Sequence, residues 1–92
     1  MEISDLENII SERIFIKIEK WNLYLGDAGL ARSLAIACIS NINYGTTEAA
    51  KLSLNSINVK IGDGDKNIPL CNLVTKSQIY ELQEILDNFL EN

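Results

Sequence analysis

The chain has 92 residues, 47% of them hydrophobic and 23% charged, and its formal net charge is −5. This length suits one domain, residues 1–92, and the composition is that of a globular protein rather than a disordered one. The acidic balance, without a cluster of Lys and Arg, argues against nucleic acid and against an anionic membrane surface as partners.

The N-terminal segment has the signals of a long helix. Ser4-Asp5-Leu6-Glu7 matches a capping box, in which the Ser hydroxyl and the Glu carboxylate satisfy free backbone amides. Apolar residues then recur at helical spacing, at Leu6, Ile10, Ile14, Ile18, Trp21 and Leu25. We therefore predict one helix over about residues 5–24 that stops at Gly26.

Two further helices follow in the prediction. Asp27 can cap a helix over about residues 28–42, whose many small residues suggest a central position with closely packed neighbours. Asn43-Tyr44-Gly45 ends it. Thr46 or Thr47 can then cap a third helix that continues to about Ser56.

The pattern changes after residue 57. Val59 and Ile61 alternate with Lys60, residues 62–67 are rich in Gly and Asp, and Ile68 and Leu70 alternate again. We predict a β-hairpin over about residues 58–70, with Pro69 limiting the second strand to an edge.

The last predicted element is a helix that begins at a second capping box. Thr75-Lys76-Ser77-Gln78 opens it, and it ends near Leu90. Its acidic residues are expected to face outward: Glu81, Glu84, Asp87 and Glu91. The predicted fold class is thus α+β and mostly helical, in the order helix-helix-helix-hairpin-helix, without an internal repeat.

Few residues are candidates for chemistry. The chain has no His, which excludes His-dependent triads and His metal sites. Asp63-x-Asp65-x-Asn67 resembles the start of a calcium loop, but Ile68 and Val74 stand where that loop needs Gly and Glu. We therefore expect no catalytic residue, no cofactor and no metal site, and we do not expect an enzyme.

The two cysteines, Cys38 and Cys71, lie in apolar surroundings and outside any CxxC motif. Such residues usually behave as small buried hydrophobes, and a disulfide is possible only if the fold brings them together.

The segment from Lys20 to Ala28 holds the only Trp and is the most distinctive in the chain. Aromatic residues beside charges are common at protein interfaces, so Lys20, Trp21, Tyr24 and Asp27 are the candidate partner-binding residues. Trp21 also falls on the apolar stripe, and the alternative is a core Trp at a helix–helix corner with Asp27 as the cap. Tyr24 is the better surface candidate of the two aromatics.

The same segment carries a family resemblance. The chain resembles a family of short cyanobacterial proteins of unknown function, through Lys20-Trp21, Leu23-Tyr24-Leu25, Asp27-Ala28, Val59-Lys60-Ile61-Gly62 and Ile68-Pro69-Leu70. The resemblance covers most of the length and implies an auxiliary role near the photosynthetic machinery.

These observations favour a non-enzymatic protein-interaction or assembly module with a protein partner. One alternative is a small-ligand sensor, with a pocket near Ala35 and Cys38 between the second helix and the hairpin. Another is a self-associating module that forms a homodimer. No apolar run is long enough to span a bilayer and no signal peptide is evident, so we expect a cytoplasmic protein.

Overall fold

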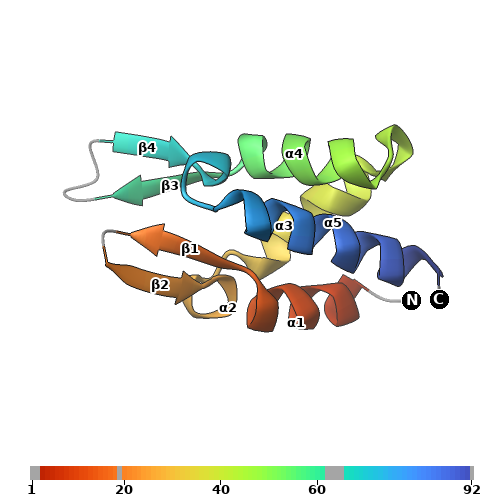
Figure 1. Ribbon diagram of the computed structural model, residues 1–92, viewed down its shortest axis with the longest axis horizontal. Helices are drawn as coiled ribbons and strands as arrows, with labels where there is room; N and C mark the ends of the chain where they lie inside the picture. Colours follow the sequence, from red (N-terminus) through yellow and green to blue (C-terminus); the bar gives the residue numbers. More distant parts are fainter. Residues whose placement is uncertain (1–2, 19, 62–65, 92) are drawn as a thin grey trace.

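The computed structural model describes residues 3–18, 20–61 and 66–91. These residues form a molecule of 41 × 22 × 21 Å, with the long helices at one end and two β-hairpins projecting from the other (Figure 1). The elements in chain order, with η marking 3-10 helices, are α1 (Ile3–Arg13), β1 (Phe15–Ile18), β2 (Trp21–Tyr24), α2 (Leu25–Ala28), α3 (Ala31–Ser40), η1 (Ile42–Tyr44), α4 (Thr46–Ser56), β3 (Asn58–Ile61), β4 (Lys66–Pro69), η2 (Leu70–Asn72) and α5 (Lys76–Glu91). The predicted class, mostly helical α+β, is confirmed.

The first helix is much shorter than predicted. α1 ends at Arg13, and the chain continues into an antiparallel hairpin in which Phe15 pairs with Tyr24 and Ile18 with Trp21. The prediction of one helix over residues 5–24 is therefore wrong, and the order of elements gains a hairpin. The hairpin buries Ile16 completely while it leaves Lys17 exposed, an alternation with the two-residue period of a strand.

The second predicted helix is divided in two. Residues 25–28 form the short helix α2, Gly29 ends it in the left-handed region with φ 73°, and α3 starts at Ala31. Gly26, predicted to end the first helix, lies inside α2. Only a residue without a side chain adopts the Gly29 conformation at little cost, so this glycine sets the break between α2 and α3.

The structure confirms some of the predicted helix caps and contradicts others. Ser4 lies one residue inside α1, and Asp27 lies inside α2 rather than before α3. Thr46 is the first residue of α4, and the preceding Gly45 provides no side-chain cap. The Thr75 half of the capping box predicted for α5 is confirmed, because the Gln78 amide donates to the Thr75 hydroxyl at 3.3 Å, whereas Gln78 Oε1 accepts from the Phe15 amide.

The backbone contains a repeat that the sequence does not show. α1, the β1–β2 hairpin, α2 and α3 follow one another in the same order as α4, the β3–β4 hairpin, η2 and α5. α1 and α4 both have 11 residues, and one residue, Ile14 or Ile57, precedes each hairpin. The hairpins close identically: the Leu25 amide donates to the Ile14 carbonyl at 2.9 Å, and the Leu70 amide donates to the Ile57 carbonyl at 2.8 Å. We call residues 3–40 the first unit and residues 46–91 the second.

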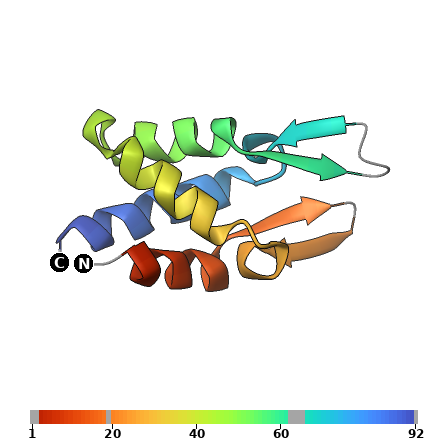
Figure 2. The ribbon, with the colours of Figure 1, turned by 180° about the vertical axis from the view of Figure 1, so that it is seen from behind.

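The core lies where the helices of both units meet. α1 packs on α3, α3 on α4, α4 on α5 and α5 on α1, and α3 crosses in front of α5 in Figure 2. The buried apolar side chains are Leu6, Ile10, Ile14, Ile16, Leu25, Ala31, Leu34, Ala35, Cys38, Ala49, Ala50, Leu54, Leu70, Leu82, Ile85 and Leu86. The small residues Ala31, Ala35 and Cys38 of α3 thus face the core, as predicted for a helix with close neighbours.

Polar contacts also join the units. Arg13 of α1 forms an ion pair with Glu81 of α5, so Glu81 does not point freely outward as predicted. The outer edge of β1 is held by α5 and the segment before it: the Phe15 amide donates to Gln78 Oε1 at 3.0 Å, and the Lys17 amide donates to the Leu73 carbonyl at 2.9 Å. These bonds fix the first hairpin relative to the second unit.

Candidate functional site

The end of the first hairpin carries the most exposed large apolar side chain among the described residues. Trp21 begins β2, directly after Lys20 in the turn, and 74% of its surface is accessible. The interpretation of Trp21 as a core residue is therefore wrong. The error follows from the missed hairpin, because the helical stripe that seemed to bury Trp21 does not exist beyond Arg13.

Trp21 belongs to the face of the hairpin that also supplies the core. Side chains alternate along a strand, so Trp21 and Leu23 share one face, and the register adds Ile16 opposite Leu23. Exposure rises along this face: Ile16 is fully buried, Leu23 is half-buried and Trp21 is exposed. The apolar inner face thus continues past the end of the core and presents Trp21 to solvent.

Tyr24 and Asp27 lie apart from this tip. Tyr24 is on the opposite face of β2, where its ring packs on Phe15 with centroids 5.5 Å apart, and 41% of its surface is exposed. Asp27 is exposed on α2. Of the candidate partner-binding residues, the structure thus brings together Lys20 and Trp21 and separates Tyr24 and Asp27 from them.

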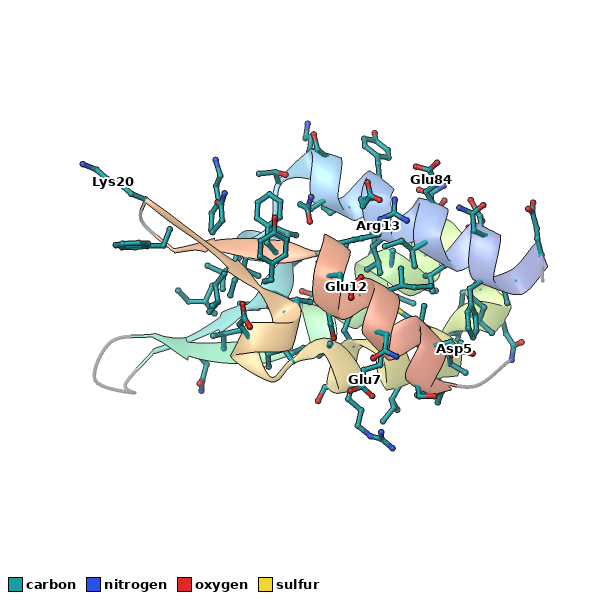
Figure 3. The ribbon with its side chains drawn as sticks, turned by 90° about the horizontal axis from the view of Figure 1, so that it is seen from below. Asp5, Glu7, Glu12, Arg13, Lys20 and Glu84 are labelled. Carbon is teal, nitrogen blue, oxygen red and sulfur yellow. The ribbon has the colours of Figure 1, made fainter. Side chains whose placement is uncertain are left out.

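Charge is unevenly distributed between the two ends of the molecule. The hairpin segments 15–24 and 58–69 contain four lysines and three acidic residues, a net of +1, so the rest of the chain accounts for −6. Figure 3 shows Lys20 at the far end of the first hairpin, whereas the labelled carboxylates Asp5, Glu7, Glu12 and Glu84 lie on the helices. Within the described part of the first hairpin, the charged side chains are Lys17 and Lys20, both cationic on a chain that is acidic as a whole.

Both cysteines are free thiols. Cys38 is fully buried in the core, as predicted, whereas Cys71 is partly exposed and lies 3.4 Å from Asn55 Oδ1. Burial raises the pKa of the Cys38 thiol from 9.0 to about 11, against the opposing effect of its hydrogen bond with Ser53. Such a thiol is a poor nucleophile at neutral pH.

The raised pKa makes Cys38 a source of alkaline instability. The folded state favours the neutral thiol of Cys38. The stability that this thiol contributes is therefore complete below pH 9 and is lost as the pH rises toward 11. Between about pH 8 and pH 10.5, wild type should lose about 2 kcal/mol more unfolding free energy than Cys38→Ala. Urea denaturation at the two pH values measures this, and equal losses in the two proteins would contradict it.

The calcium-like sequence and the alternative of a ligand pocket near Ala35 and Cys38 can be compared with the structure. Residues 62–65 of the calcium-like sequence lie outside the described part of the chain. Within the described part, no three Cys, Asp or Glu side chains are grouped closely enough to hold a metal ion. An open cleft of about 510 Å³ lies between α4 and α5, and its lining includes neither Ala35 nor Cys38, which are fully buried.

Comparison with known proteins identifies the family. Residues 3–89 match the family described as Protein of unknown function (DUF3181). The chain belongs to this family. It is 30% identical over 90 residues to the thylakoid-associated protein slr0729 of Synechocystis sp. (strain ATCC 27184 / PCC 6803 / Kazusa), a match that covers 96% of this chain and 89% of the relative. No solved structure matches the chain.

The DUF3181 assignment confirms the resemblance to short cyanobacterial proteins of unknown function. Across the described residues, no helix is both long and apolar enough to cross a membrane. The cytoplasmic location, the protein partner and the homodimer stay predictions.

Sequence reasoning missed Lys17 and the α4–α5 cleft. Lys17 is exposed in β1, and the alternation Ile16-Lys17-Ile18 was the signal that could have placed it there. The cleft is formed by residues from two helices that are distant in sequence, and no local pattern marks it.

Proposed function

We propose that this protein is a non-enzymatic interaction module that docks on a protein partner at the photosynthetic membrane of a phototrophic bacterium. The observation that carries the proposal is Trp21, 74% exposed at the end of a hairpin whose base is anchored in the core. An exposed Trp on a rigid strand costs little side-chain entropy when it enters a pocket, and Trp is the residue most enriched among interface hot spots.

The membrane location is supported by the relative. That protein is described as thylakoid-associated, and this chain matches it over nearly its whole length. Because no described helix can cross a membrane, association would be peripheral. We favour a protein over the lipid surface itself because the chain as a whole is acidic, with a net charge of −5, and an anionic bilayer would repel most of its surface.

Contacts with the second unit hold the first hairpin in place. Hydrogen bonds from Phe15 and Lys17 hold β1 against the second unit, so the hairpin does not have to be ordered on binding. The expected partner surface is an apolar pocket with acidic groups at its rim, which would receive the indole of Trp21 and meet the ammonium group of the neighbouring Lys20.

Photocrosslinking in the source cell tests the proposal. A photoreactive amino acid in place of Trp21 should crosslink to a discrete protein in the thylakoid fraction. The matched control carries the same group in place of Tyr44, which is 67% exposed near the junction of α3 and α4, at the end opposite the hairpins (Figure 1). Equal protein crosslinks from both positions, or crosslinks from position 21 to lipid alone, would contradict docking through the tip.

Trp21→Ala provides the quantitative test. Affinity for the crosslinked partner should fall at least about 30-fold, the equivalent of a 2 kcal/mol hot spot, while Tyr44→Ala should have little effect. The free energy of unfolding should change by less than about 0.5 kcal/mol in both variants, because both side chains are mostly exposed. Unchanged affinity in Trp21→Ala would refute the role of the hairpin tip.

A further inference from the structure

The cleft between α4 and α5 has a lining whose chemistry is unusual for this protein. It is formed by Thr47 and Lys51 of α4 and by Lys76, Ile79, Tyr80 and Gln83 of α5, with a volume of about 510 Å³. That volume lies within the range of small-molecule sites. On a chain with a net charge of −5, this lining holds two lysines and no carboxylate.

The two lysines are available for a ligand. The ion pairs found among the described residues join Arg13 with Glu81 and Arg32 with Glu7, so neither Lys51 nor Lys76 is neutralised by one. One ammonium group comes from each wall of the cleft. Lys76 is also the first residue of the 16-residue helix α5, whose free amides and dipole add positive potential there. An anion between the walls would meet positive charge from both.

The remainder of the lining is suited to an apolar body. Ile79 and Gln83 are half-buried lining residues, whereas Tyr80 is 68% exposed. Most of the surface that lines the cleft is apolar. The hydroxyl groups of Thr47 and Tyr80 and the amide of Gln83 supply hydrogen-bond donors for acidic oxygen atoms.

We propose that the α4–α5 cleft binds an amphiphilic anion, a molecule in which one acidic oxygen-bearing group is joined to an apolar chain or ring. The acidic group lies between Lys51 and Lys76, and the apolar part lies against Ile79 and the ring of Tyr80. The free amphiphile and the headgroup region of an anionic lipid share this chemistry. The proposal does not depend on docking through Trp21, because the cleft contains no residue of the first hairpin.

Titration followed by amide NMR shifts tests the proposal with defined probes. Dodecyl phosphate, kept below its micellar concentration, should shift the signals of residues 47–51 and 76–83. Dodecylphosphocholine and dodecyl maltoside have the same tail and no net charge, and they should bind at least about tenfold more weakly. Equal binding of the three probes, or shifts centred on residues outside the cleft, would overturn the proposal.

Variants separate the cleft from general charge effects. Lys51→Gln with Lys76→Gln should weaken dodecyl phosphate binding by about tenfold or more. Lys17→Gln with Arg32→Gln removes the same two charges from exposed positions outside the cleft and should leave the affinity within about twofold. All four side chains are exposed, so both proteins should fold. Equal weakening in the two double variants would show nonspecific charge attraction and refute the site.

Vesicles distinguish the two sources of the anion. If the ligand is a lipid headgroup, vesicles of phosphatidylglycerol and phosphatidylcholine should retain wild type in a sedimentation assay but release Lys51→Gln with Lys76→Gln. If the ligand is a free amphiphile, dodecyl phosphate alone should bind in the lysine-dependent manner. Absence of lysine-dependent binding in both arms would overturn the proposal, while the Trp21 crosslink would be unaffected.

Discussion

Replacing Leu25 or Leu70 with alanine is expected to lower the free energy of unfolding by about 2–5 kcal/mol. Both leucines are fully buried, and each is the first residue of the short helix that follows its hairpin. Truncation removes the transfer free energy of the side chain and leaves a cavity that neighbours fill only in part. A domain of this length has a total stability of only about 5–14 kcal/mol, so either change removes a large share.

Urea denaturation measures both losses, and Leu52→Ala is the matched control. This control makes the same Leu-to-Ala change at a position on α4 that is 40% exposed. It should lower the free energy of unfolding by less than about 1 kcal/mol. The repeat predicts that the losses at Leu25 and Leu70 are similar, because both side chains occupy the same position in their unit. A loss at either site no larger than that of Leu52→Ala would contradict its place in the core.

Introducing a β-branched side chain at Gly26 is the second change with a large expected effect. A Cβ at this position would lie 2.8 Å from the Cβ of Ser11, closer than real Cβ atoms approach, and 3.2 Å from the Ser11 carbonyl oxygen, which is also tight. α2 would have to move away from α1, or the backbone of α1 would have to shift. Gly26→Val should therefore cost about 2 kcal/mol of unfolding free energy.

Two controls isolate this contact from the helix propensity of valine. Asp27→Val places the same residue at an exposed position of the same helix and should cost less than about 1 kcal/mol. In a Ser11→Gly background the cost of Gly26→Val should be smaller, since the nearest atom is gone, and a double-mutant cycle measures the difference. A zero coupling energy would show that the close approach of the two helices is not the cause.

The C-terminal half of the fold was predictable because each signal was local. The third helix, the second hairpin and the last helix were all predicted, and they are bounded by a glycine, by alternation around Lys60 and by the Thr75 cap. The N-terminal half was not, because Ile14, Ile18, Trp21 and Leu25 satisfy helical spacing by coincidence. Tertiary packing decides between the two periods: in a helix the Phe15 and Lys17 amides would bond carbonyls four residues earlier, whereas here they bond the second unit and tie β1 to it.

How well the candidate site could be predicted depended on whether the first hairpin was predicted. Trp21 was correctly singled out as a distinctive residue, but its exposure depended on the hairpin. If α1 had continued to residue 24, the indole of Trp21 would have lain on the apolar stripe that includes the buried Ile10 and Ile14. The α4–α5 cleft could not be predicted from the sequence. Tertiary packing brings Lys51 to the helix that carries Lys76, and no local sequence pattern indicates that contact.

The repeated unit has a consequence for how the chain holds together. Each unit spans about 40 residues, close to the size below which a chain usually needs disulfides, metals or another chain to remain folded. Here the other unit plays that part, through α1 against α5, α3 against α4 and the bonds that tie β1 to the second unit. We therefore expect that neither unit folds by itself, and that each unit serves the other as a binding partner within one chain.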